Sequence, residues 1–107
     1  MTIAQFKKLA EKRFAYCLDL MVNAKHKEYS RNDDKLYNFK RAGHILNITP
    51  EKALAGMLSK HLVSVLDIAD ESGMENIVPK KLDEKISDAI NYLVLLEALI
   101  KERQDYL

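Results

Sequence analysis

The chain has 107 residues, 48% of them hydrophobic and 31% charged, which suits one domain with a modest core. Its net charge of +1 argues against an electrostatic nucleic-acid binder, although residues 1–52 carry a net +5 and residues 53–107 a net −4. With a lone cysteine, no signal peptide and no apolar run near the ~18 residues of a membrane span, the sequence predicts a soluble, cytoplasmic protein without a disulfide or membrane contact.

The first predicted helix covers about residues 3–29. Its apolar side chains lie within about 80° of one another and form a continuous stripe. The stripe contains Ile3, Phe6, Ala10, Phe14, Cys17, Met21 and Ala24. Glu28 falls in the middle of this stripe, so its carboxylate is either at the solvated end of a bundle or turned into a polar pocket.

Three more helices are predicted, over about residues 36–46, 50–72 and 80–103. Residues 30–35 (SRNDDK) form a polar break before the second helix. Thr49-Pro50-Glu51 is a helix start, with Thr49 as N-cap and Pro50 at the first helical position. The apolar positions of the third helix run from Leu54 to Ala69 and include His61 and Leu62.

These elements predict an all-α, four-helix bundle-like fold in a single domain over residues 1–107. It has a long first helix, a short second helix and two long antiparallel helices. The fourth helix is apolar on nearly every side from Ala89 to Ile100. Such a helix is central in a bundle or shared with a second subunit, so we expect a homodimer or a higher homo-oligomer.

Glu84, Asp88 and Asn91 share one strip of the fourth helix, and Leu95 continues the strip as an apolar side chain. Two carboxylates aimed at a buried region need a cation, which is either a basic side chain or a metal ion. The alternative is an acidic first turn that the helix dipole favours. Glu84 and Asp88 are therefore candidate metal ligands.

A second polar strip runs along the third helix and contains Lys60, Ser64, Asp67 and Glu71. Asp67 and Glu71 can share one divalent cation, and Lys60 can neutralise phosphate charge, unless the strip is a solvated face with ordinary ion pairs. His61 lies next to Lys60 on the apolar face. It is either a hydrogen-bonded core residue or a catalytic group.

Four short segments occur in a characteristic order: residues 25–30 (KHKEYS), Asn38-Phe39 with Ala42, Lys60, and the signature from Glu84 through Asp88 to Asn91-Tyr92. Together they resemble the phage and prophage proteins related to the all-α nucleoside triphosphate pyrophosphohydrolases, the group that contains MazG and the dimeric dUTPases. The chain is most similar to the phage nucleotide-modification-associated domain. The resemblance covers about residues 25–100.

This resemblance implies a MazG-like protein that binds a nucleoside triphosphate through Mg²⁺, with Mn²⁺ as an alternative ion. Its activity would be hydrolysis of that nucleotide to the monophosphate and pyrophosphate. The reaction would belong to phage nucleotide metabolism or modification within an infected or lysogenic cell. The implied metal ligands are Asp67 with Asp70 or Glu71, and Glu84 with Asp88, joined by Glu28. Lys60 would meet phosphate, His61 would orient a ligand or water, and Asn38 and Asn91 would contact the nucleotide.

The main alternative is a helical interaction module without enzymatic activity. In that interpretation the same charged residues make ion pairs between helices, and the apolar fourth helix contacts a phage or host protein.

Overall fold

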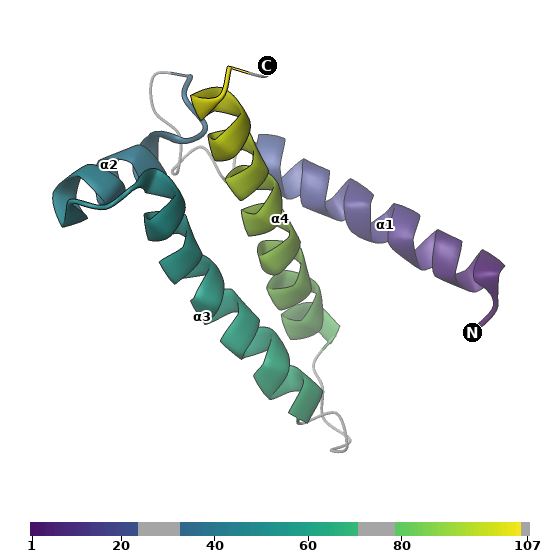
Figure 1. Ribbon diagram of the computed structural model, residues 1–107. Coiled ribbons are helices and arrows are strands. Elements are labelled where there is room, and N and C mark those ends of the chain that lie inside the picture. Colours follow the sequence, from purple (N-terminus) through teal and green to yellow (C-terminus); the bar gives the residue numbers. More distant parts are fainter. Residues whose placement is uncertain (24–32, 71–78, 106–107) are drawn as a thin grey trace.

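The computed structural model describes residues 1–23, 33–70 and 79–105, and these residues form four helices. They are α1 (Ile3–Val22), α2 (Tyr37–Leu46), α3 (Pro50–Asp70) and α4 (Pro79–Arg103). Figure 1 shows α3 and α4 side by side and antiparallel, α2 across the start of α3, and α1 beside α4. The predicted all-α, bundle-like fold is confirmed.

Side-chain caps mark the starts of α1 and α3, and the start of α3 is the one that the sequence predicts. Thr2 and Gln5 form a reciprocal capping box at the start of α1. The Thr49 hydroxyl accepts a hydrogen bond from the Lys52 backbone N–H at 3.2 Å, and α3 begins at Pro50. Side-chain caps satisfy backbone donors that have no partner within the helix, which fixes both boundaries.

The turn between α2 and α3 depends on a close backbone approach. Asn47 adopts the left-handed conformation at φ 57°, and the Ile48 N–H donates to the Gly43 carbonyl. A Cβ atom at Gly43 would lie 2.8 Å from the Ile48 carbonyl oxygen. Only glycine therefore allows α2 to approach the start of α3 this closely.

The end predicted for the first helix is wrong. α1 ends at Val22, because Asn23 has extended backbone and its side chain donates to the Asp19 carboxylate one turn earlier. A side chain that bonds back to the last turn competes with helix continuation. Residues 24–29 of the predicted helix lie outside the described residues.

The core lies where α2, α3 and α4 meet. Its buried members come from all three helices and the turn before α2; they are Leu36, Phe39, Leu54, Leu58 and Leu99. Tyr92 packs against this cluster, and its ring and that of Phe39 lie edge to face at a centroid distance of 5.8 Å. α4 is thus the central helix of the described fold, packed on α3 along one side and on α1 along another.

The predicted apolar stripe of α1 is buried only in part. Cys17 is 3% exposed, whereas Phe6 is 60% exposed and Phe14 62%. Arg13 fixes the geometry, since its guanidinium donates to the Asp83 carboxylate and the Ser87 hydroxyl of α4. α1 diverges from α4 beyond this contact, so its first half projects from the body (Figure 1).

Two predicted core positions on α3 are likewise exposed. Leu62 and Ala69 face outward, whereas Leu54, Leu58 and Ile68 are buried. No helix in the described part of the chain is long and apolar enough to cross a membrane.

Candidate functional site

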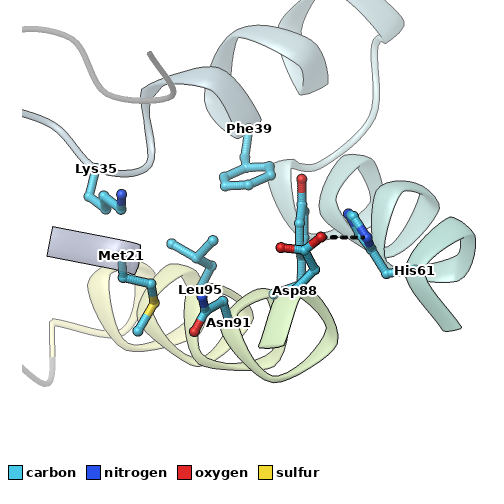
Figure 2. Close-up of a pocket in the computed structure, with 8 residues that line it drawn as sticks. Met21, Lys35, Phe39, His61, Asp88, Asn91 and Leu95 are labelled. Carbon is cyan, nitrogen blue, oxygen red and sulfur yellow. Dashed lines mark ion pairs between the residues drawn. The ribbon is translucent and has the colours of Figure 1, made fainter. Parts of the chain in front are cut away.

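A pocket opens where the end of α1, the start of α2 and the middle of α3 and α4 come together (Figure 2). It holds about 550 Å³ of empty space, a volume that includes the open solvent at its mouth. The described residues that line it come from four separate segments; they are Met21, Lys35, Phe39, His61, Asp88, Asn91, Tyr92 and Leu95.

Half of this lining comes from one face of α4. Asp88, Asn91, Tyr92 and Leu95 follow one another at spacings of three, one and three residues, which places all four on adjacent turns of the same side. The polar members lie toward the start of the helix and the apolar member toward its end. The strip that the sequence marks out on α4 therefore forms one wall of the pocket, from Asp88 onward.

His61 of α3 and Asp88 of α4 face each other at the edge of the pocket. The His61 Nδ1 atom lies 3.7 Å from an Asp88 carboxylate oxygen, and both side chains are half-buried. The imidazole also lies against the Tyr92 ring, with centroids 4.5 Å apart and planes tilted by 35°. The carboxylate and the phenol ring together hold the imidazole in one orientation at the edge of the pocket.

Asn91 presents a buried acceptor without a donor among the described residues. Its side chain is 7% exposed, and its Oδ1 atom makes no hydrogen bond to any described group. Leaving a buried amide oxygen unpaired costs about 1–3 kcal/mol. Unpaired buried groups of this kind occur at sites that a ligand completes, and Asn91 lines the pocket.

Lys35 supplies a cation on the other side of the pocket from the His61–Asp88 pair (Figure 2). Burial lowers the pKa of its ammonium group, because a charge loses solvation there. Within the described residues Lys35 makes no ion pair. It is a half-buried positive charge facing an open, partly apolar space.

A network around Asp34 holds Lys35 in place. One Asp34 carboxylate oxygen accepts from the Leu36 backbone N–H at 2.9 Å, and the other lies 2.8 Å from the Lys40 ammonium. Lys40 reaches Glu102 of α4 at 2.6 Å. The hydrogen bond from Lys40 lowers the pKa of Asp34, and hydrogen bonds from Asp34 and Glu102 raise the pKa of Lys40.

The structure brings together three of the candidate site residues, His61, Asp88 and Asn91, and separates others from them. Lys60, Asp67, Asp70 and Glu84 are exposed, and Asn38 is half-buried on α2; none of these five lines the pocket. Glu28 and Glu71 lie outside the described residues. In the described ranges, no three His, Cys, Asp or Glu side chains gather closely enough to hold a metal ion.

Sequence reasoning missed three residues of the pocket. Lys35 stands in a polar break that carries no periodic signal. The helical spacing of Phe39 and Met21 is equally typical of core residues. The one available signal for Lys35 was its place immediately before the apolar Leu36, which is 5% exposed.

No family model matches this chain, and neither a curated protein nor a solved structure matches it either.

Proposed function

We propose that this protein binds a nucleotide in the pocket between Lys35 and the His61–Asp88 pair. The observation that carries the proposal is the combination, in one pocket, of neighbouring aromatic rings, an ammonium group and a buried amide oxygen that lacks a donor. Each of these groups matches a different part of a nucleotide, and the resemblance to phage nucleotide-modification proteins supports the same class of ligand.

The base would lie against Tyr92 and Phe39, since aromatic contacts stabilise a nucleobase by about 1–3 kcal/mol. The Asn91 amide oxygen would accept a hydrogen bond from an N–H group on the base or from a sugar hydroxyl. A site with a buried polar group rejects ligands that leave that group unpaired, so Asn91 would also provide selectivity.

Lys35 would meet the phosphates. Its ammonium group already carries the cost of partial burial, and an anion beside it would restore the stability of the charged form. This role falls to Lys35 rather than Lys60, because Lys60 is exposed on α3 and outside the pocket lining.

We propose that Mg²⁺, or Mn²⁺ in its place, enters with the nucleotide. Mg²⁺ is commonly held by one or two carboxylates together with substrate phosphates and water. Asp88 is the carboxylate within the pocket, and Glu84 lies one turn earlier on α4. When bound, the ion would neutralise phosphate charge, while Asp88 would keep the His61 imidazole oriented toward a ligand or a water molecule.

The reaction implied by the resemblance is hydrolysis of a nucleoside triphosphate to the monophosphate and pyrophosphate, as part of phage or prophage nucleotide metabolism in the cytoplasm. The test is calorimetric titration of a panel of nucleoside triphosphates, with and without Mg²⁺, combined with an assay for pyrophosphate release. We expect saturable binding of at least one triphosphate. Failure of every member to bind at millimolar concentration would reject the proposal.

A second candidate function, a helical interaction module, is favoured by one separate observation. Large apolar side chains of α1 are exposed along most of the helix, including Phe6 at 60% and Phe14 at 62%. Exposed apolar surface of this extent is typical of protein interfaces. If no nucleotide binds, this becomes the leading interpretation.

A further inference from the structure

We infer that Lys40 and Glu102, which lie outside the pocket lining, are positioning residues for the ammonium group of Lys35. They act through Asp34, and they would determine how tightly the phosphates of a nucleotide bind while leaving contacts with the base unchanged. The inference rests on the proposed function, because it concerns the same pocket and the same class of ligand.

The backbone of Lys35 is held in a turn that Asp34 closes in two ways. The Asp34 side chain accepts a hydrogen bond from the Leu36 backbone N–H at 2.9 Å, and the Asp34 carbonyl accepts one from the Tyr37 N–H at 3.3 Å. Lys35 is an inner residue of both hydrogen-bonded turns. Leu36, which is 5% exposed, anchors the far side of the turn in the core. Together these contacts fix the direction in which the Lys35 side chain leaves the backbone.

The Asp34 carboxylate is itself held by a lysine that also contacts α4. Its second oxygen lies 2.8 Å from the Lys40 Nζ atom, and the same Nζ atom lies 2.6 Å from Glu102 Oε1. Asp34 precedes α2, Lys40 lies on α2 and Glu102 lies in the last turn of α4, so one ammonium group joins three segments. All three side chains are partly exposed, so these pairs contribute little to stability, and their main consequence is the geometry of the turn.

Positioning matters for Lys35 because a lysine carries its charge on a long, flexible stem. Ordering such a stem when a ligand binds costs side-chain entropy, and a stem that the protein already holds costs less. Lys35 is half-buried beside the pocket, and burial lowers the pKa of its ammonium group. Loosening the turn would let this group move into solvent, where its charge is better solvated and lies farther from the ligand.

A direct contact between Lys40 and the ligand explains the same residues less well. The Lys40 ammonium group already contacts two carboxylates, and hydrogen bonds from both raise its pKa. To reach a phosphate in the pocket it would have to leave them. Action through Lys35 requires no such rearrangement.

A double-mutant cycle between Lys40→Met and Lys35→Met tests this inference. Calorimetric titration measures the affinity for the tightest-binding nucleoside triphosphate of the panel and for the nucleoside with the same base. We expect Lys40→Met to weaken triphosphate binding about three- to tenfold, which is part of the roughly ten- to hundredfold that a charge-assisted contact supplies. Nucleoside binding should not change. In the Lys35→Met background, Lys40→Met should alter triphosphate affinity by less than about twofold, because the group through which it acts is gone.

Variants at the α4 end of the network provide a matched comparison. Glu102→Gln should weaken triphosphate binding in the same direction as Lys40→Met. Glu97→Gln is its control, because Glu97 is exposed on the same helix and, among the described residues, pairs with Lys101 alone. Lys40→Arg should restore the affinity, since a guanidinium can bridge two carboxylates. Circular dichroism shows whether each variant keeps its helix content.

An NMR titration with isotope-labelled lysine reports on Lys35 without any ligand. In Glu102→Gln a purely electrostatic effect would lower the pKa of Lys35, because a negative charge is lost. Release of Lys35 into solvent would instead raise its pKa toward the ordinary value of 10.5. We expect the rise, and an unchanged or lowered pKa overturns the inference.

The titrations separate this inference from the proposed function. If wild type and Lys40→Met bind the triphosphate equally well, the inference is wrong and the proposed function stands. The same holds if the effect of Lys40→Met persists in the Lys35→Met background, or if it is equally large for the nucleoside. A wild type that binds no triphosphate rejects the proposed function and the inference together.

Discussion

The imidazole of His61 lies between two groups of α4, with its Nδ1 atom 3.7 Å from an Asp88 carboxylate oxygen and its ring against Tyr92. This arrangement links the α3 and α4 walls of the pocket. It also means that Asp88 has a protein partner already, and any metal ion that reaches it must share the carboxylate with His61.

Replacing Asp88 by Asn tests that shared role. The substitution keeps the shape but removes the charge, and the 3.7 Å contact with His61 that it weakens is partly exposed, so the stability of the free protein should change by no more than about 1 kcal/mol. We expect the gain in nucleotide affinity produced by Mg²⁺ to disappear, whereas binding without Mg²⁺ persists. Titrations with and without the ion measure both quantities.

The matched control for Asp88 is Glu97→Gln on the same helix. Glu97 is exposed and, among the described residues, pairs with Lys101 alone, so its loss should change neither quantity. A wild-type affinity that does not respond to millimolar Mg²⁺, or an Asp88→Asn protein that responds normally, would contradict the metal proposal while leaving nucleotide binding intact.

Lys35→Met separates the pocket lysine from the other lysines of the chain. Methionine keeps most of the aliphatic stem and removes the ammonium group. Loss of a charge-assisted contact should weaken nucleotide binding by roughly 1.5–3 kcal/mol, about ten- to a hundredfold. Lys60→Met provides the comparison, because Lys60 is exposed on α3. The melting temperature and the nucleotide affinity of this variant should both stay the same. Equal affinities for wild type and Lys35→Met would remove Lys35 from the site.

The lowered pKa of Lys35 gives this site a defined pH dependence. Burial disfavours the charged ammonium in the folded state, so the cost to stability is present at neutral pH and is relieved as pH rises from the lowered folded-state pKa to the ordinary value of 10.5. Nucleotide affinity should therefore fall with rising pH on the alkaline side, before an exposed lysine titrates. Lys35→Met should show no such fall and should be at least as stable as wild type at pH 7. A fall of the same size in both proteins would assign it to another group.

The helix starts could be predicted from the sequence because their causes are local. Thr49 and Pro50 lie within four residues of the backbone groups they affect, and the hydrogen bond to Lys52 follows from that spacing. Cys17 belongs to the predicted apolar stripe and is buried, at 3% exposure, where α1 meets α4.

The exposure of α1 could not be predicted, because a periodic stripe specifies a face and not the element that covers it. Phe6 and Cys17 belong to one stripe, yet only Cys17 meets α4. Lys35 was missed for a related reason. Its place depends on Asp34 and on the long-range pair between Lys40 and Glu102, which are 62 residues apart in the chain.

The ion pair between Lys40 and Glu102 leads to a prediction about stability. Lys40→Met removes the ammonium group that joins Asp34 of the turn to Glu102 of α4, and the two partly exposed pairs together should contribute about 1 kcal/mol at neutral pH. Urea unfolding of both proteins measures the difference. Lys52→Met should be neutral, because Lys52 is exposed and forms no ion pair with the described residues.

The pH dependence of the stability difference between wild type and Lys40→Met follows from the pKa shifts of Asp34 and Lys40. The lowered pKa of Asp34 means that its contribution is present above the ordinary value of 3.8 and is lost as pH falls through the folded-state value. The raised pKa of Lys40 means that its contribution is present below 10.5 and is lost above the folded-state value. The difference between wild type and Lys40→Met should thus be constant near neutrality and shrink at both extremes. A difference that grows toward acid would contradict this assignment.

Arg13 provides the last prediction, because it is the main polar contact between α1 and the rest of the described fold. Its guanidinium lies 2.8 Å from the Ser87 hydroxyl and 2.5 Å from an Asp83 carboxylate oxygen, and Ser87 is fully buried. Arg13→Met retains the apolar stem but leaves the Ser87 hydroxyl without this donor. Loss of a charge-assisted bond to a buried group costs about 1.5–3 kcal/mol, so the free energy of unfolding in urea should fall by that amount. Lys12→Met, one position earlier and exposed, is the control and should change stability by less than about 0.5 kcal/mol.

Since Met21 carries α1 into the pocket, Arg13→Met should also weaken nucleotide binding although Arg13 does not line it. Unchanged stability in Arg13→Met would show that α1 is held to α4 by its apolar contacts around Cys17 alone.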